Sequence, residues 1–268
     1  MNAIPTPANP TPRWALITGA SSGMGYEFSK LFAQDKINAV LVARNETLLR
    51  EVAEELKRDY GISTVIAALD LSRPDTPEKL YQIVLDQGLT IDYLINNAGI
   101  GFFGPFADSD PTANAGMINL NVAALVQLTR LFVPGMIKQG RGRILNVASL
   151  TAYQPGGPGA AVYYASKSFV LAFNRGLAVE LKGSGVTTTA LCPGAMKTAF
   201  ETKGGFSRTR LYRFLASDPR TNAEAGYRAM KKGQTAAVPG WISKILAFGG
   251  EMPPRRFALW VNKMLLTP

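Results

Sequence analysis

Short apolar runs alternate with longer amphipathic stretches along most of the 268-residue chain. Seven runs are short, β-branched and apolar on both faces, which is typical of strands buried from both sides: residues 14–18, 38–43, 63–69, 92–96, 143–148, 186–191 and 235–239. Stretches with a helical pattern lie between them, at 25–34, 45–59, 75–87, 112–138 and 160–182. This alternation predicts an α/β fold: a Rossmann-type, doubly wound parallel sheet of about seven strands with helices on both faces.

The chain has no internal repeat and no interdomain linker, so we expect one catalytic domain over residues 13–268. The proline-rich residues 1–12 are predicted to form a disordered arm rather than a signal peptide. Residues of about 195–220 interrupt the alternation and are predicted to form a lid over a site. Residues of about 240–268 form an apolar, basic extension. Core packing is the first expectation for an amphipathic helix there, with dimerisation or contact with a membrane surface as alternatives.

The composition, 47% apolar and 18% charged residues, is that of a globular protein. No window has the 18 or more uncharged apolar residues of a membrane span, so a cytoplasmic protein is expected, with peripheral membrane contact left open. The net charge of +10 suits a phosphorylated cofactor, an acidic carrier or a membrane surface, or solubility alone. No Lys/Arg cluster dominates a segment, which argues against nucleic acid.

The chain has no histidine and one cysteine, Cys192. An intrachain disulfide is therefore excluded, as are Ser-His and Cys-His nucleophilic pairs. The usual zinc ligand sets are missing too, and no metal site is expected. A proton transfer near neutral pH must use a group other than imidazole.

A glycine-rich turn follows the first predicted strand, in "LITGASSGMGYEF". Gly19, Gly23 and Gly25 have the spacing G-x-x-x-G-x-G, a variant of the dinucleotide fingerprint. Glycines let the backbone approach a pyrophosphate, and the N-terminus of the next helix offers free N–H groups to it. Ser21 and Ser22 add hydroxyl donors. The alternative is a strand-helix turn without a ligand.

Arg44 indicates which dinucleotide would bind. An NAD site usually has an acid about 20 residues after the glycines, but here the second predicted strand ends in Ala43 and Arg44. A guanidinium grips a 2′-phosphate that an acid would repel. We therefore predict NADP(H), with Arg44 as the phosphate clamp; a solvated arginine is the alternative.

Two further motifs end predicted strands. Asp70 ends the third, where it is suited either to accept the adenine amino group or to cap a turn. The sequence "NNAG" at 96–99 ends the fourth, and the small Ala98 and Gly99 allow a flat or sugar group to approach. Open α/β sheets bind ligands at the carboxyl ends of their strands, so the joint placement favours one cofactor site.

The stretch "VYYASKSF" at 162–169 places Tyr163 and Tyr164 within reach of Lys167, at i+4 and i+3. A neighbouring cation lowers the pKa of a tyrosine from about 10 by about 1–3 units, so either phenol is a candidate acid or base. Spacing alone does not choose between them, and packing of both in the core is the alternative.

Taken together, the motifs resemble those of the short-chain dehydrogenase/reductase family, single-domain type, over roughly residues 13–200. The matching pieces, in the family's order, are "TGASSGMG" at 18–25, Asp70, "NNAG", Asn121 in "NLN", Ser149 after "ILNVA", "YYASK" at 163–167 and "PG" at 193–194. The long tail is loosely similar to the hydroxysteroid dehydrogenase and long-chain 3-oxoacyl reductase branch.

The resemblance implies a role for each matching residue. Tyr163 exchanges a proton with the substrate, Lys167 lowers the pKa of Tyr163 and binds the nicotinamide ribose, Ser149 holds the substrate oxygen, and Asn121 anchors a water. Tyr164 is then a packing residue. The expected cofactor-binding residues are Gly19, Ser21, Ser22, Gly23, Met24, Gly25, Arg44, Asp70, Leu71, Asn97, Ala98, Gly99, Tyr163, Lys167, Pro193, Gly194 and Thr198.

A hydrophobic carbonyl compound is the expected substrate. The expected apolar wall consists of Ile100, Phe102, Phe103, Leu150, Tyr153, Pro155, Phe200, Phe206 and Leu211. Lys203, Arg208 and Arg210 form either a solvated lid surface or a contact for an anionic group. A homo-oligomer, dimer or tetramer, is implied by the family, although the tail alters the end of the chain that often mediates tetramers. The alternative function is a non-catalytic NADP(H)-binding sensor or scaffold.

Overall fold

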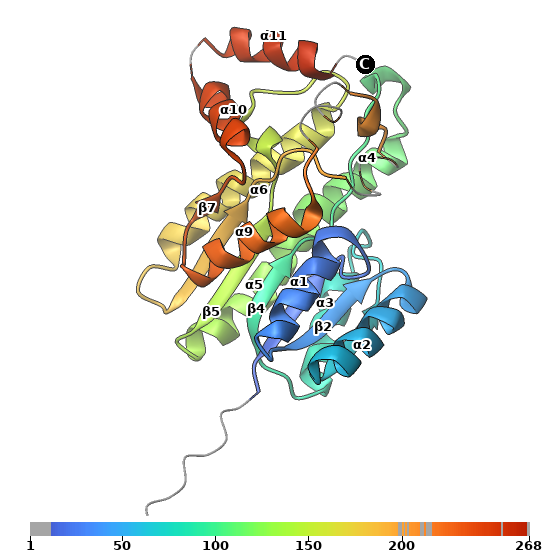
Figure 1. Cartoon of the computed structure of the whole chain (residues 1–268), viewed down its shortest axis with the longest axis vertical. Coiled ribbons are helices and arrows are strands. Elements are labelled where there is room, and N and C mark those ends of the chain that lie inside the picture. The colour runs from blue at the N-terminus through green and yellow to red at the C-terminus, as the bar shows by residue number, and fades with distance from the viewer. Residues whose placement is uncertain are drawn as a thin grey trace, which may run out of the picture.

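The computed structural model describes residues 12–197, 200, 202, 204–209, 212, 216–252 and 254–266. Its centre is a parallel sheet of seven strands in the order β3-β2-β1-β4-β5-β6-β7 (Figure 1). The strands are β1 (Trp14–Thr18), β2 (Asn38–Ala43), β3 (Thr64–Ala68), β4 (Ile91–Asn96), β5 (Gly142–Val147), β6 (Val186–Leu191) and β7 (Ala236–Ala237). The predicted Rossmann-type fold is confirmed.

Helices cover both faces of the sheet because neighbouring strand residues point to opposite sides. Ile17 faces the core layer under α1 (Gly23–Gln34), α2 (Glu46–Tyr60) and α9 (Pro219–Lys231). Leu16 faces the layer under α3 (Thr76–Asp86), α5 (Leu125–Lys138) and α6 (Ala161–Glu180). Figure 1 shows this layered arrangement, with α1 and α9 side by side. Both layers are needed to bury strands that are apolar on both faces.

The expected helix over 112–138 is interrupted. The chain forms α4 (Pro111–Ile118), a π-helical segment Asn119–Ala124, and then α5. A π segment widens one turn of a helix and is frequent at functional sites. Here the π segment contains Asn121, so the predicted continuous helix is wrong at a predicted site residue.

Taken together, α4, the π segment and α5 form one helical stretch, Pro111–Lys138, and among the described residues this is the one stretch long and apolar enough to cross a membrane by length and composition. In the fold, Leu128 and Phe132 of this helix are buried in the core layer that also contains Leu80 of α3. The core helix of a globular protein meets the same two criteria, so the finding carries little weight.

A buried ladder of polar side chains crosses the sheet from β4 to β6. Asn96 donates from Nδ2 to Thr129 Oγ1 (3.0 Å) and to Asn146 Oδ1 (2.9 Å). Asn146 donates in turn to Asn174 Oδ1 (3.0 Å) of α6 and to Thr188 Oγ1 (3.3 Å). Buried polar groups cost free energy unless they are paired, so this ladder favours one register of β4, β5 and β6.

The C-terminal extension forms two helices rather than one, α10 (Trp241–Glu251) and α11 (Arg255–Leu266). They lie at the end of the molecule beyond α6 (Figure 1). Gln154 donates from Nε2 to the Leu246 backbone oxygen of α10 (2.7 Å), and Asn262 of α11 donates from Nδ2 to the Gly156 oxygen (2.7 Å). Both helices are thus fastened to the loop before α6.

Two predictions on domain organisation fall partly outside the described residues. The N-terminal arm does so except for residue 12, and the lid does so at 198–199, 201, 203, 210–211 and 213–215. Within the described part of the lid, Phe200 and Phe206 stack on each other, with ring centroids 6.0 Å apart. Lys203, Arg210 and Leu211 also lie outside the described residues.

Candidate active site

A cleft of about 780 Å³ runs across the carboxyl ends of β1, β2, β4 and β5. The order of the strands changes direction between β1 and β4, where parallel sheets of this kind bind ligands. Most of the predicted site residues line the cleft: Gly19, Ser21, Ser22, Gly23, Met24, Arg44, Asp70, Leu71, Asn97, Ala98, Gly99, Ser149, Tyr163, Lys167, Pro193 and Gly194. Gly25 and Asn121 lie behind this wall, and Thr198 lies outside the described residues.

The glycine turn is closely packed. Gly19 has φ +70°, a conformation that favours glycine, and a Cβ atom on Gly25 would lie 2.0 Å from the Gly19 oxygen. Ser22 is the N-cap of α1 and makes no side-chain capping bond, and the first turn of the fully described α1 has no acidic residue. The first N–H groups of α1 can therefore receive an anion, and the turn fits a pyrophosphate.

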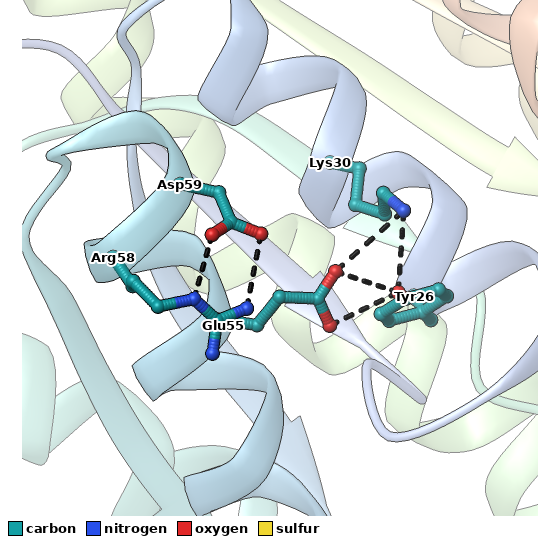
Figure 2. A network of polar contacts seen from close by, with 5 residues as sticks. All are labelled: Tyr26, Lys30, Glu55, Arg58 and Asp59. Atoms are coloured by element: carbon teal, nitrogen blue, oxygen red, sulfur yellow. Dashed lines mark hydrogen bonds and ion pairs between the residues drawn. The ribbon is translucent and has the colours of Figure 1, made fainter.

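Polar contacts hold α1 against α2 beside this turn (Figure 2). Tyr26 donates from its hydroxyl to both carboxylate oxygens of Glu55, at 2.8 and 3.0 Å. Lys30 donates to the Tyr26 hydroxyl at 3.3 Å and pairs with Glu55 at 3.6 Å. These contacts join the first turns of α1, which follow the glycine turn, to α2, which begins two residues after Arg44.

Arg44 is exposed at the end of β2 and lines the cleft near Asp70. Burial raises the pKa of Asp70, but hydrogen bonds from Ser72 and the positive charges of Arg44 and Arg73 outweigh it, so this pKa lies below its usual value. Ser72 donates to Asp70 Oδ1 from its backbone nitrogen (3.1 Å) and hydroxyl (2.8 Å). Asp70 thus caps a turn and still presents a carboxylate to the cleft.

Thr18 is a site residue to which the sequence analysis gave no role. Its hydroxyl accepts hydrogen bonds from the backbone nitrogens of Asn97 and Ala98, both at 2.9 Å, and donates to the Ile95 oxygen at 3.1 Å. Asn97 also donates from Nδ2 to the Thr18 oxygen at 2.8 Å. These bonds fasten the end of β1 to the "NNAG" segment after β4, which fixes the floor of the cleft.

Lys167 of α6 is buried and lines the cleft. Its Nζ atom donates to the backbone oxygen of Val147 at the end of β5 (2.8 Å) and lies 5.9 Å from the centroid of the Tyr163 ring. Burial lowers the pKa of Lys167 to about 8. The shift brings the pKa of this amine closer to neutral pH than that of an exposed lysine.

Asn121 is held by the π segment against the loop after β4. Its Oδ1 accepts from the Ile100 nitrogen (3.0 Å), and its Nδ2 donates to the Ile100 oxygen (2.9 Å) and to the Ser166 hydroxyl (3.1 Å). A Cβ atom on Gly99 would lie 3.2 Å from Asn121 Oδ1 and 3.4 Å from Lys167 Nζ. The absence of a side chain at Gly99 therefore leaves space in front of both polar groups.

The two tyrosines occupy different places. Tyr163 lines the cleft and also a smaller apolar cavity of about 70 Å³, whereas Tyr164 lines only the cavity. The Tyr164 ring packs so closely on Gly157 that a Cβ atom there would lie 2.3 Å from it. Burial raises the pKa of Tyr164 further above its usual value. Ser149 lines both hollows, as Tyr163 does, and its Oγ accepts from the Thr151 nitrogen (3.2 Å).

The apolar cavity has a different wall from the one expected. Its described lining residues are Ser149, Leu150, Thr151, Gln154, Tyr163, Tyr164, Gly194, Ala195, Phe200, Phe206, Thr209, Tyr212, Leu246, Asn262, Leu265 and Leu266. Leu150, Phe200 and Phe206 were expected there. Ile100 lines the cleft instead, Phe103 packs on the Phe206 ring (centroids 5.9 Å apart), and Phe102 is exposed.

The predictions for Tyr153 and Pro155 are also wrong for the described cavity wall. The Tyr153 ring lies under the Arg175 guanidinium, 5.3 Å from the ring centroid, on the side of α10. Conversely, Leu246 of α10 and Asn262, Leu265 and Leu266 of α11 line the cavity although they were not predicted to do so. The apolar pattern of the C-terminal extension was the available signal, but nothing in it indicates a contact with a loop about 100 residues earlier.

Comparisons with known proteins agree with this geometry. A family model described as short chain dehydrogenase matches residues 13–205. The chain is 34% identical over 186 residues to very-long-chain 3-oxoacyl-CoA reductase of Anas platyrhynchos, covering 67% of this chain and 58% of that protein. It is 32% identical over 251 residues to the ketoacyl reductase HetN of Nostoc sp., covering 91% of this chain and 86% of that protein.

A solved structure gives the same result. The short-chain dehydrogenase from Sphingobium yanoikuyae in complex with NADPH superposes with a TM-score of 0.78 at 28% identity, covering 93% of this chain and 96% of that one. The sheet order, the glycine turn and the match over residues 13–205 identify the same family. The chain therefore belongs to the short-chain dehydrogenase/reductase family of oxidoreductases.

Proposed function

We propose that the protein is an NADP(H)-dependent oxidoreductase acting on the CH–OH group of a hydrophobic secondary alcohol or on the corresponding ketone. One observation carries the proposal: Tyr163 and Ser149 line both the dinucleotide cleft and the apolar cavity. A substrate carbonyl in the cavity would thus meet two hydroxyl groups at the border with the cleft. The protein would act in the cytoplasm, either free or peripheral to a membrane.

The cofactor would lie along the cleft. The N-terminus of α1 would bind the pyrophosphate, Asp70 and Leu71 the adenine end, and Pro193 and Gly194 the nicotinamide end. When bound, NADPH supplies the hydride for the substrate carbon. Arg44 favours NADPH over NADH, because a guanidinium at the end of β2 pairs with a 2′-phosphate. The relative from Sphingobium yanoikuyae, solved with NADPH, supports this choice.

The side chains of this protein would handle the proton. In the reducing direction Tyr163 would donate its phenolic proton to the carbonyl oxygen of the substrate. Ser149 donates a hydrogen bond to the same oxygen, and both donors bind the developing negative charge more strongly than they bind the ketone. Lys167 then returns a proton to Tyr163, and Asn121 anchors the water that resupplies Lys167.

The substrate would be a lipophilic ketone, such as a 3-oxoacyl thioester or a steroid. The cavity wall is mainly apolar and aromatic, as expected for such compounds. Two relatives support this class: the 3-oxoacyl-CoA reductase of Anas platyrhynchos and the 17-beta-hydroxysteroid dehydrogenase type 3 of Mus musculus, which is 33% identical over 188 residues.

The test is NADPH oxidation against a panel of ketones, steroids and 3-oxoacyl thioesters. Tyr163→Phe should abolish turnover and keep NADPH binding, whereas the matched variant Tyr164→Phe should retain near-normal turnover. Turnover that survives Tyr163→Phe would overturn the assignment. NADPH binding without turnover of any compound would instead favour a sensor or scaffold.

A second experiment tests the cofactor. The binding constants of NADPH and NADH are measured for the wild type and for Arg44→Asp. We expect the wild type to prefer NADPH and the variant to lose that preference. A wild type that prefers NADH, or a variant that keeps the NADPH preference, would show that Arg44 is not the clamp.

A further inference from the structure

The C-terminal helices α10 and α11 expose an unusual amount of apolar surface. Of the 17 large hydrophobic side chains that are exposed among the described residues, eight lie on these two helices and a ninth, Met252, directly follows α10. The nine are Trp241, Ile242, Ile245, Phe248, Met252, Phe257, Leu259, Trp260 and Met264. We call this set the outer face. An apolar patch of this extent on a globular protein usually marks an interaction site.

The outer face is not needed to attach the helices to the rest of the protein. Ala247 and Gly250 of α10 and Ala258, Asn262 and Leu266 of α11 are the buried residues, and they form the opposite, inner face. The outer aromatic side chains are each more than half exposed: Trp241 is 72% exposed, Phe248 68%, Phe257 64% and Trp260 56%. Phe257 and Trp260 stack on each other, with centroids 5.9 Å apart.

The charges around the outer face are almost all positive. Lys244, Arg255 and Arg256 are exposed on the same two helices. Glu251 is the only acidic residue in the sequence of either helix, and it pairs with Arg175 of α6 at 3.0 Å. Tryptophan and phenylalanine side chains insert at the boundary of a bilayer, and each cation near an anionic lipid surface strengthens binding.

We propose that the outer face of α10 and α11 docks on an anionic lipid bilayer, with the aromatic side chains inserted at the level of the headgroups. Charge favours this occupant over a second copy of the chain. A two-fold contact places the same patch of both copies face to face, and here it would bring the cations of one copy against those of the other. An anionic surface instead neutralises them.

The inner face gives this docking a role, which rests on the proposed function. Leu246 of α10 and Leu265 and Leu266 of α11 line the apolar cavity that Tyr163 borders. The same two helices therefore separate the cavity from the surface that would contact lipid. A lipophilic ketone dissolved in the bilayer would then be separated from the Tyr163 hydroxyl group only by the width of these two helices.

The test is flotation of the full chain with vesicles of phosphatidylcholine alone and of phosphatidylcholine mixed with an equal amount of phosphatidylglycerol. We expect flotation with the mixed vesicles and its loss at high salt, since surface charges are screened by salt. Equal flotation with both compositions would overturn the anionic part of the proposal. Flotation with neither would overturn docking.

Two sets of variants locate the contact. Lys244→Gln, Arg255→Gln and Arg256→Gln together should lower partitioning onto the mixed vesicles by about 100-fold. The matched control, Lys57→Gln, Lys182→Gln and Lys232→Gln, removes three exposed cations elsewhere and should change partitioning by far less. If both triple variants lose binding equally, the net charge rather than α10 and α11 is responsible and the proposal fails.

The aromatic side chains are tested by Trp241→Ser, Phe248→Ser, Phe257→Ser and Trp260→Ser, with Leu85→Ser and Val179→Ser as the control. The aromatic variant should lose flotation while its turnover of a water-soluble ketone is kept, which separates docking from the proposed chemistry. Sedimentation measures the oligomeric state of the wild type and so tests whether a second copy of the chain covers the outer face instead. A dimer that the aromatic variant converts to a monomer, together with an absence of vesicle binding, would show that a second copy covers the face.

Discussion

A hydrogen bond joins Lys167 of α6 to Val147 of β5: the Lys167 Nζ atom donates to the Val147 backbone oxygen at 2.8 Å. This bond holds the amine of α6 at the end of β5, in the wall of the cofactor cleft. A long side chain that is buried and fixed at one end keeps its geometry as its protonation changes. Burial also removes the ammonium group from water, which disfavours its charged form, and the effect on the free energy of unfolding is measurable.

The first prediction concerns pH. Burial lowers the pKa of Lys167 from 10.5 to about 8, so between these pH values the unfolded chain binds more protons than the folded one. The free energy of unfolding should therefore rise with pH across this window, by on the order of 3 kcal/mol from this group, and the penalty should be complete below pH 8. Denaturant unfolding of the cofactor-free wild type and of Lys167→Met measures the difference. The control Lys182→Met should keep the wild-type slope; a Lys167→Met variant that also keeps it would contradict the prediction.

The second prediction concerns Gly99. A methyl group there would point at Asn121 Oδ1 and Lys167 Nζ and fill the cleft in front of them. We expect Gly99→Ala to fold and to bind NADPH about tenfold more weakly or worse, which corresponds to about 1.4 kcal/mol. Titration of NADPH measures this. Gly104→Ala is the matched control, because a Cβ atom at Gly104 meets no atom within 4 Å. Unchanged binding in Gly99→Ala would mean that the cofactor does not use this space.

The third prediction concerns the polar ladder in the sheet. Asn146→Ala removes the partner of Asn96 Nδ2 and of Asn174 Oδ1 inside the core. Stability should fall by about 1–3 kcal/mol, because buried polar groups that lose a partner keep their desolvation penalty. Chemical denaturation reports the loss. Replacement of the exposed Gln82 by alanine should change stability by less than about 0.5 kcal/mol. A loss of stability in Asn146→Ala no larger than that in Gln82→Ala would show that the ladder contributes little to stability.

The fourth prediction concerns Cys192, the only cysteine of the chain. The side chain is fully buried, and burial raises the pKa of its thiol to about 12. A thiol reagent at pH 8 should therefore react only as the protein unfolds, since the thiolate is the reactive form. The labelling rate is compared with the unfolding rate, and chain unfolded in guanidinium should label once per molecule. Rapid, complete labelling of the native protein would contradict the buried position.

The sheet was predictable because its strands are buried on both faces. The runs that became β1, β2 and β6 matched the structure to the residue, since a continuous apolar run bounded by turn residues leaves little freedom of assignment. The position of the cleft was predictable for a related reason: the motifs ended strands, and parallel strands end at one edge of the sheet.

What escaped prediction depends on contacts between distant segments. The π segment at Asn119–Ala124 leaves the helical period of the sequence almost intact, so the pattern could not show where Asn121 points. Tyr163 and Tyr164 are both within reach of Lys167 by spacing. Only the fold distinguishes them, because Tyr163 lines the cleft and Tyr164 does not. The wall of the cavity is completed by α11, whose contact with Gly156 spans more than 100 residues of chain.

The two faces of α11 therefore contact different surroundings. Trp260 and Met264 face outward, whereas Asn262 and Leu266 face the interior. Mutations that change which molecules enter the cavity and mutations that change contact with a membrane would then lie two positions apart on a single helix. If both proposals hold, sequence changes confined to α10 and α11 would alter substrate choice and membrane contact while Ser149, Tyr163 and Lys167 stay the same.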